Sequence, residues 1–437
     1  MTKIKIIGGG LAGCEASYQL LKRGYAVQLY EMRPYTKSPA HRTDKLAELV
    51  CSNSLKSEIP STASGALKAE LDVLDCLLLR CARASRVPAG SALAVEREIF
   101  SDAVYRNLCG FEKFELIREE STKIDTHAPT IIASGPLTSD KLGDEISRIF
   151  GDRDLHFYDA VAPIIDGESI DKDVAFFASR YDENDTDYLN IGMNKEQYDA
   201  FYNELINAET VVLKDFEKKE IFEGCMPIEV MAKRGGDSIR FGPLKPIGIR
   251  SPKNNEKYYA VAQLRKENNS ASMYNMVGFQ TNLTFREQKR VFGMLPSLEN
   301  AEFLRYGVMH RNTFLNSPEM LNSRLQSKLY ENIFFAGQIT GVEGYVESIM
   351  TGLFAGVYMA AFLENNMLEI PSENTICGSL LRYIASKNDN FQPMNANFGI
   401  LPQLEIKQKD KKQRKISYYN RSNSDIIDFN VKNKINI

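Results

Sequence analysis

The chain lacks the features that mark membrane, secreted and metal-binding proteins. No apolar run approaches the roughly 20 residues that a helix needs to span a bilayer, and the opening MTKIKIIGGG runs from a short apolar stretch into glycines, unlike a signal peptide. The seven cysteines are odd in number, no two have C-x-x-C spacing, and there are only four histidines. We therefore expect no disulfide framework and no metal site, and we expect a cytoplasmic protein.

The charge and length of the chain narrow the class of protein further. A net charge of −3, from 54 basic and 57 acidic residues, excludes a generally cationic nucleic-acid coat but leaves room for a local basic patch. The hydrophobic fraction of 43% and the charged fraction of 25% indicate a folded, soluble chain. Its 437 residues exceed one ordinary single-core domain, so we expect two domains, one of them inserted into the other.

The first 31 residues carry a nucleotide-binding pattern. Residues 3–7 predict a buried strand, GGGLAG at 8–13 fits G-x-G-x-x-G before a helical stretch, and a second strand, YAVQLYE, ends at Glu31. This strand–turn–helix–strand order favours a dinucleotide cradle over a merely structural glycine turn, with Glu31 accepting ribose hydroxyls. The predicted cofactor-binding residues of the turn are Gly8, Gly9, Gly10, Leu11, Ala12 and Gly13.

Later segments favour FAD over NAD, since an acid such as Glu31 fits either cofactor. TIIASGP at 130–136 and IFFAGQITG at 333–341 predict apolar strands that end in glycine turns, and a long helical stretch follows the second. A strand–glycine–helix unit near the C-terminus commonly covers the flavin end of FAD, so Gly337 and Gly341 are predicted to bind the cofactor. No second complete G-x-G-x-x-G indicates a dedicated NAD(P) domain.

The order of these segments predicts an α/β fold with a split domain. We expect a FAD-binding, Rossmann-like domain of the glutathione-reductase type over 1–150 and 300–402, and an inserted α+β domain over 151–299. Residues 403–437 form a basic C-terminal tail with nine Lys or Arg against four Asp or Glu. The tail is either solvated or poorly ordered, or it is an arm that contacts phosphates, in which case its binding weakens as salt rises.

Cysteine 225 lies in a segment that favours an ionised thiol. FEGCMPIEVMAKRGG places Cys225 just ahead of a short helix, with Pro227 suited to its first turn. A helix dipole there favours thiolate over thiol, and the alternative is a buried structural cysteine.

Two further segments carry weaker candidates. Cys51, in AELVCSNSLKSE, follows an apolar segment that looks helical and begins a polar loop, and composition alone favours a structural role. His310 and Arg311 join an imidazole and a cation among aromatic residues, which suits an anionic or planar ligand as well as ordinary packing.

Ten segments between residue 6 and about residue 399 closely resemble one family, the folate- and FAD-dependent tRNA (uracil-5-)-methyltransferases of bacteria. They include IIGGGLAGCEAS, ELVCSNSLKS, RVPAGSALAVER, FEGCMPIEVMAKRG, YNMVGFQTN, GQITGVEGYVES and NFQPMNANFG. FEGCMPIEVMA and GQITGVEGYVES are far more specific than a dinucleotide fingerprint. The larger FAD proteins that modify the tRNA wobble uridine share the expected fold, but the shorter chain and FEGCMPIEV argue against them.

The resemblance implies transfer of a one-carbon unit from 5,10-methylenetetrahydrofolate to C5 of a uracil in RNA, with the T loop of tRNA as the target. Cys225 would add to uracil C6 as a thiolate and make C5 nucleophilic. Reduced FAD would carry the methylene and supply reducing equivalents, and NADH or NADPH would re-reduce it. Cys51 would lie near the flavin, with proton abstraction and handling of a flavin adduct as open roles, and His310 would contact folate.

The chain also departs from the family pattern, which keeps other functions open. Asn282 stands where the family has His, Thr284 where it commonly has Lys, and Ile191 and Gly192 where it often has Cys-Pro. The first alternative is the same chemistry on a ribosomal RNA uracil. Two further alternatives rest on other features. The dinucleotide fingerprint alone would fit a flavin oxidoreductase that does not act on RNA, and the basic tail would fit a non-catalytic RNA-binding module. The sequence leaves the oligomeric state open.

Overall fold

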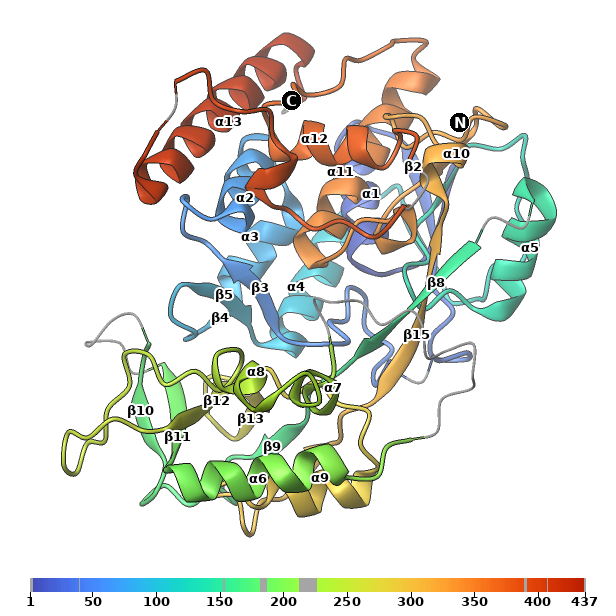
Figure 1. Cartoon of the computed structure of the whole chain (residues 1–437). Coiled ribbons are helices and arrows are strands. Elements are labelled where there is room, and N and C mark those ends of the chain that lie inside the picture. Colours follow the sequence, from blue (N-terminus) through green and yellow to red (C-terminus); the bar gives the residue numbers. More distant parts are fainter. Residues whose placement is uncertain are drawn as a thin grey trace.

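The protein is built around two large hydrophobic cores. The computed structural model describes residues 3–38, 40–151, 154–180, 187–211, 226–388, 391–406 and 408–435, without the side chains of 154–159 and 310–311. The first core joins both ends of the chain, from Ile4 to Ile435, and the second is formed by residues between Ile165 and Ala301. The antiparallel pair β8 (Asp154–Ala160) and β15 (Met309–Leu315) runs between the two parts (Figure 1).

A parallel sheet forms the centre of the first part. In the described chain its strands, from edge to edge, are β16 (Ile333–Phe335), β7 (Thr130–Ile132), β1 (Lys3–Ile7), β2 (Ala26–Tyr30) and β6 (Phe114–Ile117). Each neighbouring pair is parallel. The strands are short and rich in β-branched and aromatic residues, as expected for a sheet covered on both faces. The order places strands from the two ends of the chain side by side.

Helices cover this sheet, and two of them pack unusually closely. The helix α1 (Leu11–Leu21) crosses α11 (Tyr345–Leu363) where a Cβ on Gly352 or Gly356 would overlap the backbone of Ala12 or Ala16. By length and composition α11 is apolar enough to cross a membrane, so the prediction that the chain has no such apolar run is wrong. However, 89% of this apolar stretch is buried inside the protein. It is therefore the core helix of this part.

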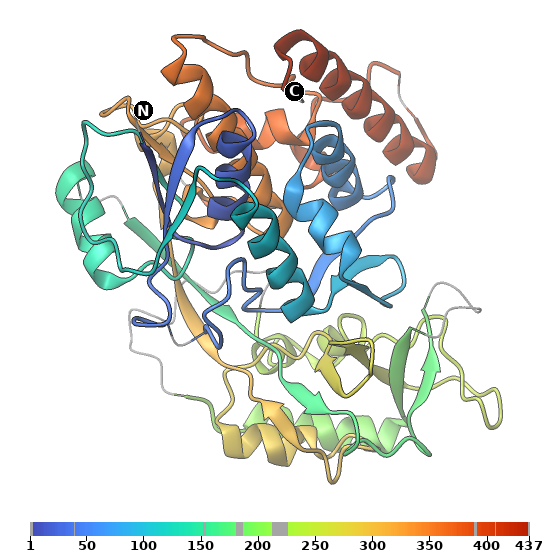
Figure 2. The same cartoon turned by 180° about the vertical axis from the view of Figure 1, so that it is seen from behind.

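The remaining elements of the first part surround these two helices (Figure 2). Its other helices are α2 (Ala63–Val73), α3 (Leu77–Ala84), α4 (Arg97–Cys109), α5 (Asp140–Phe150), α10 (Ser317–Met320), α12 (Ile376–Tyr383), α13 (Lys411–Asn433) and the 3-10 turns η3 (Gln338–Thr340) and η4 (Phe398–Ile400). A small sheet has the order β3 (Ser54–Ser57), β5 (Ala92–Val95), β4 (Arg86–Val87).

The second part is an antiparallel sheet with helices packed on it. Its described strands, in order, are β10 (Phe176–Ala178), β11 (Tyr188–Met193), β12 (Ala260–Lys266), β13 (Met273–Met276), β9 (Ile164–Asp166) and β14 (Phe303–Arg305). Its helices are α6 (Lys195–Asn207), α7 (Ile228–Ala232), α8 (Gly236–Arg240) and α9 (Phe285–Phe292). The separate core supports an inserted domain, and the boundaries at 151 and 299 stay a prediction.

The prediction of a poorly ordered C-terminal tail is wrong for residues 411–433. They form α13, which packs on α2 with Ile426 and Phe429 buried in the first core. The fully buried carboxylate of Glu70 on α2 accepts hydrogen bonds from the Ser422 hydroxyl and from the N–H groups of Ile376 and Cys377 (2.7 and 2.8 Å) at the start of α12. The Glu70 carboxylate therefore joins α2, α12 and α13. The charge pattern of the tail gave no sign of this arrangement.

Removing residues 403–437 is expected to lower the free energy of unfolding by about 3 kcal/mol or more, because burial of a side chain such as Ile426 or Phe429 contributes about 1.5–3 kcal/mol. Chemical denaturation of the truncated and full-length proteins measures the loss. The control replaces the exposed Lys411, Lys412 and Lys415 with Gln, which should change stability by less than about 0.5 kcal/mol. Equal stability of the truncated protein would show that α13 does not support the core.

Candidate active site

The glycine turn between β1 and α1 has the geometry of a phosphate cradle. Gly8 has a φ of +109°, and a Cβ on Gly13 would overlap the Gly8 carbonyl, so only glycine fits either position. Gly10 precedes α1, and a Cβ there would meet no atom within 4 Å. The N-terminus of α1 thus opens onto free space, where its unpaired N–H groups and dipole favour an anion.

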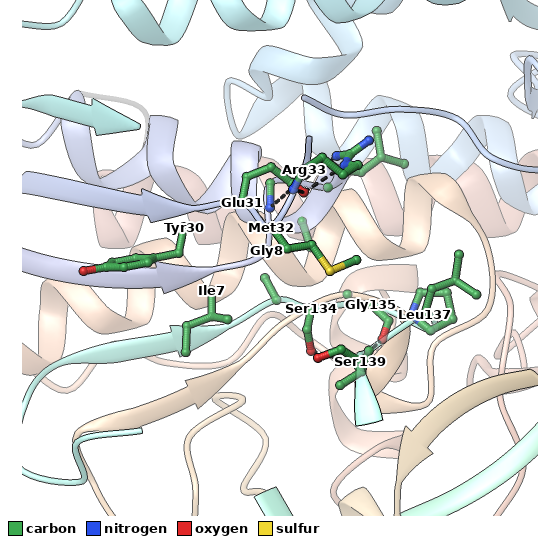
Figure 3. Close-up of a pocket in the computed structure, with 18 of the residues that line it drawn as sticks. Ile7, Gly8, Tyr30, Glu31, Met32, Arg33, Ser134, Gly135, Leu137 and Ser139 are labelled. Atoms are coloured by element: carbon green, nitrogen blue, oxygen red, sulfur yellow. Dashed lines mark hydrogen bonds and ion pairs between the residues drawn. The ribbon is translucent and has the colours of Figure 1, made fainter. Parts of the chain in front are cut away.

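A cavity lies at the carboxyl ends of the parallel strands, next to this turn. It is bounded by the glycine turn, the end of β2, the segment after β7, the turn after β16 and the first turn of α11. Figure 3 shows Glu31 and Arg33 on one side and Ser134, Gly135 and Ser139 on the other. Open α/β sheets bind nucleotides at this edge, so the residues present fit the dinucleotide that the turn predicts.

Glu31 is held in place by Arg33, a partner that sequence reasoning missed. Its carboxylate accepts hydrogen bonds from the Gly9 N–H (3.1 Å) and from Arg33, through Nε (2.8 Å), Nη2 (2.9 Å) and the backbone N–H (3.0 Å). Arg33 also donates to Glu48 (2.7 Å). Burial alone would raise the pKa of Glu31, but hydrogen bonds and charge from Arg33 lower it. The carboxylate is therefore ionised and fixed at the cavity wall.

The other predicted cofactor residues separate into two groups. Leu11, Ala12 and Gly337 line the cavity, and a Cβ on Gly337 would lie 3.1 Å from that of Ala12. Gly341 does not line it in the described structure, and a Cβ there would overlap the ring of Phe391. Gly341, with a φ of +83°, fits closely against Phe391, and its role in cofactor binding stays a prediction.

The loop that carries Cys51 reaches the edge of the same cavity. Val50 and Tyr345 line the cavity, and Cys51, half-buried between them, donates its N–H to the Tyr345 hydroxyl (2.8 Å). Arg305 donates to the Val50 carbonyl (2.6 Å). The segment ahead of Cys51 is irregular rather than helical, as expected of a backbone whose carbonyls bind distant side chains. Burial raises the pKa of Tyr345, which keeps its hydroxyl protonated.

Arg97 ties this loop to the second part of the molecule. It donates to the carbonyls of Leu49 and Cys51 (3.2 Å to the latter) and forms an ion pair with Glu267 (2.7 Å), whose side chain is 2% exposed. Beside it, Asn53 bridges the parts by donating to Lys266 O (3.1 Å). The cysteine loop is thus fixed where both parts meet, a placement that no local sequence signal indicates.

Cys225 lies outside the described residues, and the described chain resumes at Met226, just before α7. That helix, α7, is fastened to the segment after β13: the Ile228 N–H donates to Gln280 O (2.7 Å). Glu229, 1% exposed, accepts from the Thr281 hydroxyl and the Asn282 N–H, both at 2.8 Å. Glu229 thus holds α7 in place against the segment after β13.

The remaining sequence candidates have mixed outcomes. His310 lies on β15 opposite position 159 of β8, and its side chain is not described. At the departures from the family pattern the side chains stabilise backbone: Asn282 donates to Val211 O (3.0 Å), and Thr284 caps α9. At Gly192 a Cβ would overlap the ring of Tyr258.

The described residues contain no group of His, Cys, Asp or Glu that could hold a metal ion.

Comparison with known proteins agrees with this geometry. Residues 3–367 match the family described as Glucose inhibited division protein A. The chain is 50% identical over 423 residues (97% of each chain) to the methylenetetrahydrofolate–tRNA-(uracil-5-)-methyltransferase TrmFO of Syntrophomonas wolfei, and 52% identical to the protein of the same name from Listeria monocytogenes (94% of this chain, 95% of the relative). Its structure is similar to that of Aquifex aeolicus GidA, with a TM-score of 0.68 at 14% identity over 96% of this chain and 73% of that one. The likeness confirms the predicted α/β, Rossmann-like fold.

Proposed function

The chain belongs to the Glucose inhibited division protein A family and, within it, to the methylenetetrahydrofolate–tRNA-(uracil-5-)-methyltransferases TrmFO, and from this premise we propose that it methylates C5 of a uracil in tRNA with a folate one-carbon unit and FAD. The observation that carries the proposal is the meeting of three features at one cavity. These are the glycine turn with Glu31, the first turn of α11, and the loop that bears Cys51.

The chain itself binds and orients the cofactor. The N-terminus of α1 is suited to the pyrophosphate, and the ionised Glu31, held by Arg33, is suited to ribose hydroxyls. The wall that Gly337, Gln338 and Tyr345 contribute suits the flavin end. Bound FAD supplies the one-carbon transfer and redox chemistry, which protein side chains lack.

Two cysteines are proposed to act on the pyrimidine and beside the flavin. The thiolate of Cys225 adds to uracil C6, so that the electron pair of the C5–C6 bond becomes available at C5 for the folate-derived carbon. Loss of the C5 proton then releases the carbon from its carrier as a methylene group on C5. Departure of the thiolate restores the ring once this methylene has gained a hydride equivalent, which reduced FAD would supply. Cys51 is proposed to act at the cavity edge, because its loop is fixed by Tyr345, Arg97 and Arg305.

The finer assignments are also proposals. NADH or NADPH is proposed as the reductant and His310 as a folate contact, both on the resemblance alone. The basic end of α13, where residues 409–415 are exposed and include five Lys or Arg, supports an RNA contact on the first part of the molecule. A cytoplasmic setting fits this substrate.

Methylation in vitro tests the function. The purified protein should be yellow, and with methylene-labelled 5,10-methylenetetrahydrofolate and NADPH or NADH it should place label in 5-methyluridine of unmodified tRNA. Label in ribosomal RNA alone would favour that target instead. Full NAD(P)H oxidation without RNA, and no label in any RNA, would favour a flavin oxidoreductase. A colourless protein that binds RNA would favour a binding module.

A further inference from the structure

Three aromatic rings form a parallel stack that leads from the second core to the surface. Phe303, at the start of β14, packs against that core, and its ring lies 5.3 Å from that of Tyr306 at an angle of 2°. The ring of Phe285 also stacks on that of Tyr306, with a distance of 4.7 Å between the ring centres and an angle of 16°. Phe285 is 53% exposed, so the outer end of the stack faces solvent. Such offset stacking continues readily onto another flat ring.

The stack is held rigidly by polar contacts behind it. The amide of Gln288, fully buried on α9, donates to the Gly307 carbonyl (2.8 Å) and accepts from the Gly307 N–H (2.7 Å). A Cβ on Gly307 would lie 2.6 Å from both Thr281 Cγ2 and Val161 O, so the backbone next to Tyr306 fits tightly. Thr284 caps α9 directly before Phe285. A ring that docks on Phe285 would thus meet a surface that needs no reordering.

The surroundings of Phe285 are basic. Arg286 and Lys289 on the same helix are exposed, whereas Arg290 forms ion pairs with Glu287 (2.6 Å) and Glu204. An aromatic face flanked by exposed cations is the combination that recognises unpaired bases, whose rings stack and whose phosphates carry negative charge.

The stack lies on the second part of the molecule, and direct contacts join it to the candidate active site. Arg305, the neighbour of Tyr306, donates to the carbonyl of Val50 at the cavity edge (2.6 Å). The segment ahead of Phe285 holds α7 through Glu229, and α7 begins three residues after Cys225. Figure 1 shows α9 near the foot of β15, on the second part of the molecule. Phe285 itself does not line the cofactor cavity, so it is not placed to stack a ring against the flavin.

We propose that the outer face of Phe285 is a stacking platform for an unpaired base of the RNA substrate, next to the uracil that enters the active site. The proposal rests on the proposed function. Removal of the uracil from its stack leaves neighbouring bases exposed, and a rigid aromatic face that accepts one of them stabilises the opened loop. Folate is the competing planar ligand, and the test separates the two.

The chain contains no tryptophan, which gives a direct probe. In a Phe285→Trp variant the single indole should lose fluorescence when unmodified tRNA is added, because a stacked base quenches it. The control is Phe177→Trp, since Phe177 is 43% exposed and lies on β10, at the opposite edge of the sheet from β14. Its fluorescence should change little at the same RNA occupancy, measured by anisotropy of labelled tRNA.

A Phe285→Ala variant should raise the KM for tRNA by a factor of about 5 to 150, the effect of one lost base–aromatic stack, with kcat and FAD content nearly unchanged. Unquenched fluorescence of Phe285→Trp in a complex that is methylated would overturn the platform and leave the function intact. Quenching by tetrahydrofolate rather than by RNA would also overturn it. A wild-type protein that neither binds nor methylates RNA would overturn both the stacking platform and the proposed function.

Discussion

Replacing Cys225 with alanine is expected to abolish methylation of tRNA while the protein stays yellow. In the proposed reaction uracil C5 becomes nucleophilic only after the thiolate has added to C6, so its loss should lower kcat by at least about 1,000-fold. FAD binding should persist because the glycine turn, Glu31 and Arg33 all belong to the first part of the molecule.

The measurement is incorporation of labelled methylene carbon into tRNA, alongside flavin absorbance per protein. Cys109→Ala is the matched control, because Cys109 is an exposed free cysteine at the end of α4, and it should keep full activity. Methylation that survives in the Cys225→Ala protein would remove Cys225 from the mechanism. A colourless Cys225→Ala protein would instead show that residue 225 supports the part of the structure that binds FAD.

Replacing Arg97 with methionine is expected to lower both stability and activity. Glu267, whose side chain is 2% exposed, would lose its cationic partner, and a buried charge left alone typically costs about 3–5 kcal/mol. Since the Arg97 side chain is 20% exposed, about 3 kcal/mol is the expected loss. The carbonyls of Leu49 and Cys51 would lose their donor as well, so the cysteine loop would no longer be fixed beside the cavity.

A double variant, Arg97→Met with Glu267→Gln, separates these two effects. Without the carboxylate there is no unpaired buried charge, so most of the stability should return in chemical denaturation. Activity should stay low, because the loop still lacks its donor. Full activity in the double variant would show that the contacts of Arg97 with the loop do not matter, and equal stability of the single variant and the wild type would contradict the buried-pair argument.

The sequence predicted well the features that neighbouring residues form, and it missed the contacts between residues far apart in the chain. The strand, glycine turn and helix that start the chain follow one another within 31 residues, so spacing alone predicted them and the close fit at Gly13. The contacts that fix Cys51 join it to Tyr345, 294 residues away, and to Arg97, 46 residues away, and no periodicity links such positions.

Even some local features escaped prediction because one residue type serves several roles. Arg33 is only two residues from Glu31, yet nothing in EMR distinguishes a buried partner from a surface arginine. The prediction of a poorly ordered tail failed for a similar reason. Its charges dominate the composition, whereas a few residues of α13, such as Ile426 and Phe429, decide that it packs. Burial is a property of the assembled core, and the pattern of 403–437 alone does not contain it.

The order of strands in the parallel sheet has a consequence for how the protein is made. The edge strand β16 and the core helix α11 come from residues 333–363, whereas their neighbours β7 and α1 come from the first third of the chain. During synthesis on the ribosome, domains fold as their residues emerge. The second core, between residues 165 and 301, is therefore complete while the first still waits for its last strand, and the nascent chain can take up FAD only near the end of translation.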